Sequence, residues 1–572
     1  MPTIEHPILS LDRTRRVALF CFLVLFYFTS GVTNRVESVD TLAFSADAEV
    51  TPFWHNHDAR LLLFYRLNRA VYRTLDFLGL DWGVYAVLGL LGSLFAAGSV
   101  LLLYRLFRSA FELSKPASIA GSATLAFSYG FLRYANEVEV YIGAIFLTLL
   151  CVNLIFFYIR QPSLTATRCL LLGALSGIAV GYYQPIALAL FFAATVLFVN
   201  RRYYVQYLAY GAAGVGTYLL ILALSLGGAS GRIPTPHDIR ALIFARSSEF
   251  DPPVFGASSL VKAGAAILHD FTSIISLYGL PGVDTMLAQK MPYHHYYAES
   301  IFFAARNYPL SSAAVVTFIL AMAWFTFMIS AAIMRKERRP LDAAITFAFA
   351  WLILAGAVNI ILNPAEREVW ILSLVPATII ITAFVFEPLR DRPSYLAATA
   401  LILLLHNIIG GLGIFWNDKG DLFASRSAWI RANADQGDWI LTTGEKSDWF
   451  DRMRILRYPI ARRQSHRTED PFLNFMYFDG QNAFVQRWHV GAYVALTPKE
   501  MLLKLKTTGG RVFALDATVS PRPLPQRIDV DGASEQLASF GRFLRAYATV
   551  VADGPTGKTF EIDKTKLPSS FP

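Results

Sequence analysis

Three short groups of acidic and histidine residues could carry chemistry in this chain of 572 residues. Each group lies beside a long apolar run, and the members are Glu37, Asp40, Asp47 and Glu49; His55, His57 and Asp58; and Glu137 and Glu139. A carboxylate can serve as a general base, and a histidine can transfer a proton or, when charged, bind a phosphate. Because a charge at membrane depth costs about 2.5–3.5 kcal/mol on insertion scales, charged groups next to such runs require an explanation.

Asp40 is the preferred candidate for a general base or a metal ligand. It precedes the apolar stretch TLAF, which we expect to fold back onto the membrane surface. The other acids of this group, Glu37, Asp47 and Glu49, are predicted to be ordinary acids of a solvated loop.

His55 and His57 are candidates for binding a phosphate or another part of a substrate. Their spacing of two residues differs from the i, i+4 spacing of zinc-binding histidines on a helix, so no metal site is predicted. Asp58 could instead cap the N-terminus of the helix predicted to follow.

Glu137 and Glu139 lie in the sequence NEVEVY, at a tight connection between two apolar runs. One acid could form a local ion pair with Arg133 that eases the turn. Alternatively, one acid lies in a polar cavity shared with Asp40 and binds substrate there. A weaker candidate is Arg367 in NPAEREVW, which could hold a phosphate through paired hydrogen bonds.

The composition is that of a polytopic membrane protein. Hydrophobic residues make up 55% of the chain and charged residues only 16%, against about 25% charged in a typical soluble protein. The apolar segments predict about eleven spanning helices, and they are residues 17–34, 84–104, 117–135, 140–159, 169–182, 184–199, 205–227, 311–334, 341–362, 369–387 and 394–415. The net charge of +9 is divided among short clusters between these segments, so nucleic-acid binding is not expected.

The basic clusters all fall on one side of the membrane if the N-terminus is cytoplasmic. The candidate residues, the loops near 35–83 and 228–310, and the tail would then lie outside the cytoplasm. This alternation requires a tight turn at residues 181–185, because one Pro-kinked helix there would change the parity of the spans.

The loops and the tail are predicted to have structure of their own. Residues 60–78 read as an amphipathic helix that lies on the membrane surface, with Arg60, Arg66, Arg69 and Arg73 on its polar positions. Residues 1–415 form the predicted transmembrane domain, and residues 416–572 a small soluble α/β domain. In the tail, strands are expected at 437–444, 494–496 and 511–515 and a helix at 498–505. The tail shows no Gly-rich phosphate loop and no catalytic signature.

Several of these motifs resemble those of GT-C fold glycosyltransferases, polyprenyl-phosphate-sugar-dependent membrane enzymes that include protein O-mannosyltransferases. Those enzymes carry an acid in the first extracytoplasmic loop, which Asp40 in SVDTLAFSAD matches. The stretches FWHNHDARLLLFYRL, NEVEVY and NPAEREVWILSLVP are similar to a His-rich stretch, an acid-plus-Tyr motif and a late loop of that family. The chain departs from the usual paired acids, since Thr41 follows Asp40, so the second acid would be Asp47 or come from another loop. It also departs from the usual His-Pro, since Asn56 follows His55.

The resemblance implies an integral membrane glycosyltransferase that moves a sugar from a polyprenyl-phosphate-linked donor to a lipid, glycan or protein acceptor. Asp40 would deprotonate the acceptor hydroxyl as it attacks the anomeric carbon with inversion, and Arg367, His55 or His57 would stabilise the departing phosphate. No cofactor is required, and a divalent cation is compatible with this mechanism. The implied location is the cytoplasmic (inner) membrane of a bacterium, with membrane lipids as further partners.

Three other functions stay open from the sequence. A transporter or flippase for a lipid-linked sugar would show acids or broken helices near the bilayer midplane and, often, internal repeats. A polysaccharide polymerase or ligase would use the same class of substrate on the same side. A scaffold would bind a partner through its tail.

Overall fold

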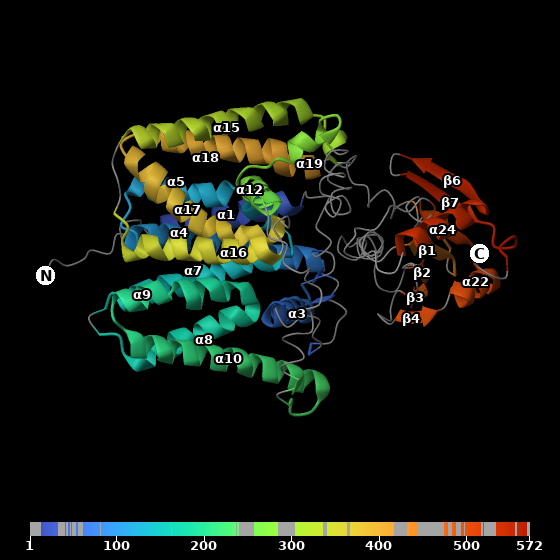
Figure 1. The fold of residues 1–572 in the computed structure, drawn as a ribbon, viewed down its shortest axis with the longest axis horizontal. Coiled ribbons are helices and arrows are strands. Elements are labelled where there is room, and N and C mark those ends of the chain that lie inside the picture. The colour runs from blue at the N-terminus through green and yellow to red at the C-terminus, as the bar shows by residue number, and fades with distance from the viewer. Residues whose placement is uncertain are drawn as a thin grey trace. The chain divides into compact units, whose positions relative to one another are not determined.

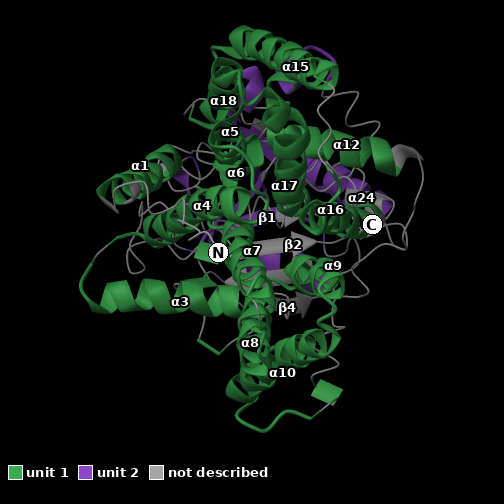
Figure 2. Ribbon diagram, turned by 90° about the vertical axis from the view of Figure 1, so that its left-hand side faces the viewer, with its two compact units in different colours: residues 1–34, 44–277, 308–416 green, residues 35–43, 278–307, 417–572 purple. Residues whose placement is uncertain are grey.

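The structure, a computed structural model, describes residues 13–568 with gaps. The longer gaps are residues 33–40, 55–60, 239–256, 284–303, 417–428, 444–473 and 520–532. The chain divides into two compact units, coloured separately in Figure 2. Unit 1 comprises residues 1–34, 44–277 and 308–416, and unit 2 comprises residues 35–43, 278–307 and 417–572.

Every apolar segment predicted to span the membrane is helical (Figure 1). The helices of unit 1 include α1 (Arg13–Val32), α3 (Leu62–Phe77), α4 (Val84–Ser109), α5 (Lys115–Phe127), α6 (Tyr129–Tyr134), α7 (Val140–Ile159), α8 (Ala166–Tyr182), η2 (Gln184–Ile186), η3 (Leu188–Ala193), α9 (Thr195–Asn200), α10 (Tyr204–Ser230), α12 (Ala257–Phe271), η5 (Ile275–Gly279), α15 (Ser311–Met334), α16 (Ala343–Leu362), α17 (Arg367–Ile381), η6 (Thr382–Phe386), η7 (Glu387–Leu389), α18 (Pro393–Asn407), η8 (Ile408–Leu412) and α19 (Gly413–Phe415). Among the described residues, seven helices are long and apolar enough to cross a membrane, and three shorter apolar helices accompany them. The predicted fold class, a helical polytopic membrane protein with a small C-terminal α/β domain, is confirmed. By helix length and composition, the described residues support seven long spans, against about eleven spans predicted.

Two breaks divide the apolar segments. The backbone of Ser128 is extended (φ −62°, ψ 144°) and separates α5 from α6. The backbone of Tyr183 is also extended (φ −153°, ψ 110°), so α8 ends there and η2, which contains Pro185, begins. The break predicted at residues 181–185 is therefore present, and one continuous helix through it is excluded.

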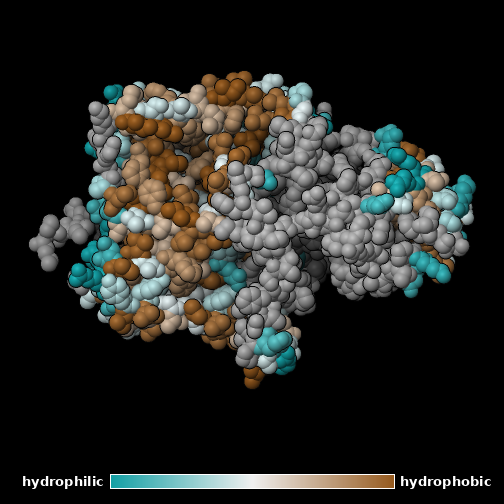
Figure 3. Space-filling model, in the orientation of Figure 1, coloured by the Kyte–Doolittle hydropathy of each residue, from teal (hydrophilic) through white to brown (hydrophobic). Residues whose placement is uncertain are grey.

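Unit 1 has the surface of a membrane-embedded bundle. On α15, the side chains of Val316, Ile319 and Leu320 are more than half exposed, and Figure 3 shows hydrophobic residues covering the face over α15 and α16. Inside, α8 packs closely on α10 because Gly173 and Gly177 bring the helices together, and a Cβ at either glycine would overlap a carbonyl oxygen of α10. Such helix contacts through small residues are typical of membrane bundles.

The basic connections between the spans meet at one end of the bundle. Arg160, after α7, donates to the carbonyl oxygens of Ser109 and Ala110 after α4. Arg335, after α15, pairs with Asp391 before α18 at 3.0 Å. Because these helices alternate in direction, the α6–α7 connection and the start of α17 lie at the opposite end.

The first loop contains the predicted helix, α3, but two of its arginines, Arg66 and Arg69, are buried and do not lie on a polar surface as the sequence predicts. Arg69 is completely buried and donates to both carboxylate oxygens of Asp47 at 2.8–3.0 Å and to the Phe53 carbonyl oxygen at 2.9 Å. Asp47 is 7% exposed, so the prediction that it is an ordinary solvated acid is wrong. The exposed apolar residues gather at the end of the helix, where Phe77 is 88% exposed and Leu78 63%.

Arg66 faces inward from the same helix. It donates to the Ser225 hydroxyl of α10, and its guanidinium carbon lies 5.0 Å from the centre of the Trp54 ring. Burial, and after it the charge of Arg69, lowers the pKa of the Arg66 guanidinium. Because arginine stays protonated in proteins, these contacts stabilise a buried charge. Arg66 therefore fastens the helix to α10, and Arg69 fastens it to the preceding part of the loop.

Unit 2 contains a mixed sheet of seven strands in the order β4-β3-β2-β1-β5-β7-β6. The strands are β1 (Trp439–Thr443), β2 (Asn474–Phe478), β3 (Ala483–Arg487), β4 (Tyr493–Leu496), β5 (Val512–Leu515), β6 (Ala548–Gly554) and β7 (Gly557–Ile562), and the helices α22 (Pro498–Thr507) and α24 (Ala533–Arg545) accompany them. β1 runs parallel to β2 and β5, and the remaining pairs are antiparallel. Leu505 of α22 and Phe540 of α24 share a core with Leu441 of β1, so both helices cover the sheet.

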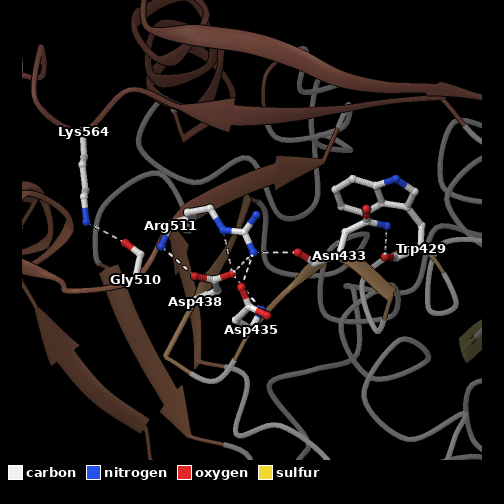
Figure 4. A network of polar contacts seen from close by, with 7 residues as sticks. All are labelled: Trp429, Asn433, Asp435, Asp438, Gly510, Arg511 and Lys564. Carbon is white, nitrogen blue, oxygen red and sulfur yellow. Dashed lines mark hydrogen bonds and ion pairs between the residues drawn. The ribbon is translucent and has the colours of Figure 1, made fainter.

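A polar network joins the segment before β1 to the start of β5 (Figure 4). Arg511 donates through Nε and Nη2 to the buried carboxylate of Asp438, and its backbone N–H donates to the same group at 2.7 Å. Nη2 also reaches Asp435 and the Asn433 carbonyl oxygen. Arg511 therefore holds two sequence-distant segments of the tail in register.

Breaking the buried Asp47–Arg69 pair should destabilise unit 1. Asp47→Asn leaves Arg69 inside without its counter-charge, a change that costs about 3–5 kcal/mol in buried pairs. We expect a clearly lower midpoint of thermal unfolding in detergent, followed by intrinsic fluorescence. Replacing both residues, by Asp47→Asn with Arg69→Met, should recover part of the loss.

The exposed pair Arg232–Asp238 is the matched control, and Asp238→Asn should leave the midpoint almost unchanged. Equal midpoints for Asp47→Asn and Asp238→Asn would contradict the anchoring role of the buried pair.

The two ends of α10 should be reachable from opposite sides of the membrane. In a Cys21→Ser background, Ile233→Cys should react with an impermeant maleimide in intact cells, whereas Arg201→Cys should react only after permeabilisation. Both positions are exposed, and the remaining cysteines, Cys151 and Cys169, are buried. The reverse pattern would invert the predicted orientation, and labelling of both positions in intact cells would remove α10 as a span.

Candidate active site

A buried ion pair occupies the α6–α7 connection. Arg133, near the end of α6, is 7% exposed and donates through Nε to Glu137 Oε1 at 3.1 Å. Glu137 is 1% exposed. The break at Ser128 makes α6 a separate short helix, and the spacing of four residues lets the two side chains meet across its end. The local ion pair, one of the two interpretations of NEVEVY, is therefore present.

Aromatic rings enclose the guanidinium of Arg133. Its central carbon lies 5.5 Å from the centre of the Tyr134 ring and 5.2 Å from that of the Phe415 ring, which closes α19. Both rings are within the range of favourable cation–π contact. The last helix of unit 1, distant in the sequence, thus supplies part of the environment of this arginine.

Glu139 lies on the other side of the same turn. It is 7% exposed, occupies the position just before α7 and interacts electrostatically with Tyr141. The rings of Tyr134, Tyr141 and Tyr183 follow one another at 5.5 and 5.7 Å. A row of tyrosines therefore extends from Arg133 to the break between α8 and η2.

Two further acids approach this region from other elements. Glu368, in the first turn of α17, interacts electrostatically with Arg133 and Tyr134. Asp270, at the end of α12, is 1% exposed and lies against Gly130 of α6, where a Cβ would come 3.0 Å from its Oδ1. The neighbouring His269 packs its ring against Tyr129 at 4.9 Å. Four separate elements thus bring charged groups to one end of unit 1.

Asn407 fixes the end of α12 to the bundle. Its Nδ2 donates to the carbonyl oxygens of Phe127 and Phe271 at 2.7 and 2.8 Å, and its Oδ1 accepts from the Ser273 N–H at 2.9 Å. The next residue back, His406, contacts the Ser273 carbonyl oxygen through Nε2 at 2.8 Å. These bonds position Asp270 beside α6.

The predicted site residues are described to different extents. Glu137 and Glu139 lie together at the α6–α7 connection and are both buried. Arg367 is the first residue of α17, and its side chain lies outside the description, as do Asp40, His55 and His57 altogether. In the described part of the chain, no group of three or more metal-ligating side chains occurs.

Sequence reasoning did not single out Arg133, Asp270 or Glu368 as site residues. Asp270 ends an apolar loop helix, and Glu368 follows Arg367 within NPAEREVW. An acid at the end of a helix near the membrane face is the sequence feature that could have identified both residues. Burial beside α6 could not be inferred, because it depends on contacts between distant segments.

Comparisons with known proteins give likenesses of structure. No family model and no curated protein sequence matches the chain. ArnT from Cupriavidus metallidurans bound to undecaprenyl phosphate is 11% identical, with a TM-score of 0.48 over 96% of this chain and 98% of that one. The archaeal oligosaccharyltransferase AglB from Archaeoglobus fulgidus, in complex with an inhibitory peptide and a dolichol-phosphate, is 12% identical, with a TM-score of 0.44 over 97% and 75%. Arabinofuranosyltransferase AftD from Mycobacteria is 10% identical, with a TM-score of 0.39 over 97% of this chain and 40% of that one.

Removing the Asn407 amide should loosen α12. Asn407→Leu keeps the size of the side chain but leaves two carbonyl groups and one N–H without their partner, at about 1–3 kcal/mol for each buried group. We expect a lower thermal midpoint and faster limited proteolysis within residues 257–283. Asn359→Leu, which removes a single bond to the Val369 carbonyl oxygen, is the control. Equal proteolysis of the two variants would contradict the role of Asn407.

Proposed function

We propose that the chain is an integral membrane glycosyltransferase that moves a sugar from a polyprenyl-phosphate-linked donor to an acceptor on the extracytoplasmic face. The observation that carries the proposal is the charged cluster at one end of an apolar helical bundle, opposite the basic connections. NEVEVY and NPAEREVW, which resemble GT-C fold motifs, supply Glu137, Glu139 and Glu368 to that cluster.

The cluster suits a substrate with both apolar and charged parts. A polyprenyl chain requires a hydrophobic surface, and the exposed faces of the spanning helices provide one. The phosphate requires cationic or N–H donors, and the acceptor hydroxyl requires a carboxylate base. Buried charges at the edge of a membrane are costly and are generally kept for function, which favours a site here over a merely structural turn.

Asp40 is the proposed base. It takes the proton of the acceptor hydroxyl while that oxygen attacks the anomeric carbon from the side opposite the phosphate. The bond between the anomeric carbon and the phosphate oxygen breaks, and its electron pair stays on the phosphate. The configuration is thereby inverted, and the polyprenyl phosphate is left in the membrane. His55, His57 and Arg367 are proposed to stabilise the departing phosphate, with a divalent cation compatible with the site.

The remaining parts of the proposal follow from sidedness. The Lys and Arg clusters between the spans favour a cytoplasmic N-terminus and an extracytoplasmic tail in a bacterial inner membrane. The acceptor is a lipid, a glycan or a protein that enters from that side.

The alternatives predict other arrangements. A transporter for a lipid-linked sugar would concentrate its charges near the bilayer midplane, whereas Arg133 and Glu137 lie at a helix connection. A polymerase or ligase would transfer a glycan chain instead of a single sugar, so the size of the transferred unit separates it from the proposed enzyme.

Asp40→Asn should abolish most transfer in proteoliposomes that contain a polyprenyl-phosphate sugar donor. Loss of a general base lowers the rate by about 10²–10⁴-fold, and the anomeric configuration of the product tests inversion. Asp238→Asn, at an exposed surface pair, should retain full activity. Normal turnover of Asp40→Asn with correct membrane insertion would remove Asp40 from the mechanism.

A further inference from the structure

We infer that Arg133 binds the phosphate of the lipid-linked donor through its two terminal nitrogens, beside the N-terminal end of α17. This inference rests on the proposed function and adds to it the residue that recognises the leaving group. The sequence predicts that Glu137 binds substrate. In this inference Glu137 instead positions Arg133.

The first argument is the hydrogen bonding of a buried guanidinium. The Arg133 side chain is 9% exposed, and a group so buried needs hydrogen-bond acceptors. Its Nε donates to Glu137, and no acceptor for the terminal nitrogens occurs in the described part of the chain. The edge of the guanidinium that best matches two phosphate oxygens is therefore available to a ligand.

The second argument is orientation. Glu137 holds the Nε side, and the rings of Tyr134 and Phe415 lie within cation–π distance of the guanidinium carbon. A guanidinium held by one carboxylate and two rings keeps its direction, so less rotamer entropy is lost when an anion binds.

The third argument is the neighbouring helix. α17 has 15 residues and packs against α6, the helix that carries Arg133, and Glu368 stands in its first turn. The N-terminal end of a helix carries partial positive charge and N–H groups without helical partners, which favour an anion. Two cationic contributions thus come together from elements far apart in the sequence.

The nearby carboxylates limit the affinity of this site. Glu137 and Glu368 offset part of the positive charge, so a phosphate should bind weakly enough to be released after each transfer. A lipid phosphate and a free phosphate present the same oxygens. The position of α6 at the end of apolar helices favours the lipid, whose chain adds hydrophobic binding energy.

The test measures binding of radiolabelled undecaprenyl phosphate to the full-length protein in nanodiscs. Arg133→Met should weaken binding at least about tenfold, as expected for loss of a charge-assisted bidentate contact. Arg133→Lys keeps the charge that faces Glu137 but loses the paired donors, so it should weaken binding several-fold. Arg232→Met, which removes an exposed arginine from the same side, is the control and should bind like the wild type.

Competition identifies the source of the phosphate. Unlabelled undecaprenyl phosphate should displace the probe, whereas inorganic phosphate and phosphatidylglycerol should do so only at far higher concentration. Displacement by inorganic phosphate at equal concentration would overturn the assignment to a lipid. If Arg133→Met fails to fold, Arg133→Lys provides the test. Unchanged affinity for undecaprenyl phosphate in folded Arg133→Lys would overturn bidentate binding.

The same proteins separate this inference from the proposed function. If the wild type binds undecaprenyl phosphate through Arg133 but transfers no sugar from any donor, the inference stands and the enzyme proposal fails. If the wild type transfers sugar and Arg133→Met does so with an unchanged KM for the donor, the enzyme proposal stands and Arg133 is not its phosphate-binding residue.

Discussion

The constraint on which this end of the bundle depends is that a charge can be buried beside a membrane only when other groups compensate for the lost water. The pair formed by Arg133 and Glu137 meets that condition within one short helix, α6. The pair fits there because the chain breaks at Ser128 and turns again before Val140. The two breaks in the backbone therefore allow the ion pair to form within this short segment.

The same rule organises the first loop. Arg69 is compensated by Asp47 of the same loop, and Arg66 by the Trp54 ring and by the Ser225 hydroxyl, which fastens α3 to α10. The exposed apolar residues of α3 lie near Phe77. The first loop from Phe44 onward thus belongs to unit 1, and any movement of α3 would have to break these polar contacts.

Apolar length was sufficient to predict the spanning helices of unit 1, and amphipathic periodicity predicted α3. Turn residues with short apolar runs predicted β1, β4, β5 and α22 of the tail. The sequence did not predict β2, β3, β6, β7 or α24, and these strands are stabilised by pairing with other strands of the sheet. It placed Arg66 and Arg69 on the polar surface of α3, because helical periodicity cannot distinguish a solvated arginine from one that meets a buried partner. Asp270 was missed because its place beside α6 depends on contacts between segments distant in the sequence, among them the bonds of Asn407.

The acids of NEVEVY illustrate how environment divides the roles of neighbouring residues. Glu137 has one oxygen committed to Arg133 and therefore acts on the site through that arginine. Glu139, two residues on, directly precedes α7 and interacts electrostatically with Tyr141. A motif match alone would assign both acids to the substrate. The geometry instead makes Glu137 part of the frame that keeps the Arg133 guanidinium in place.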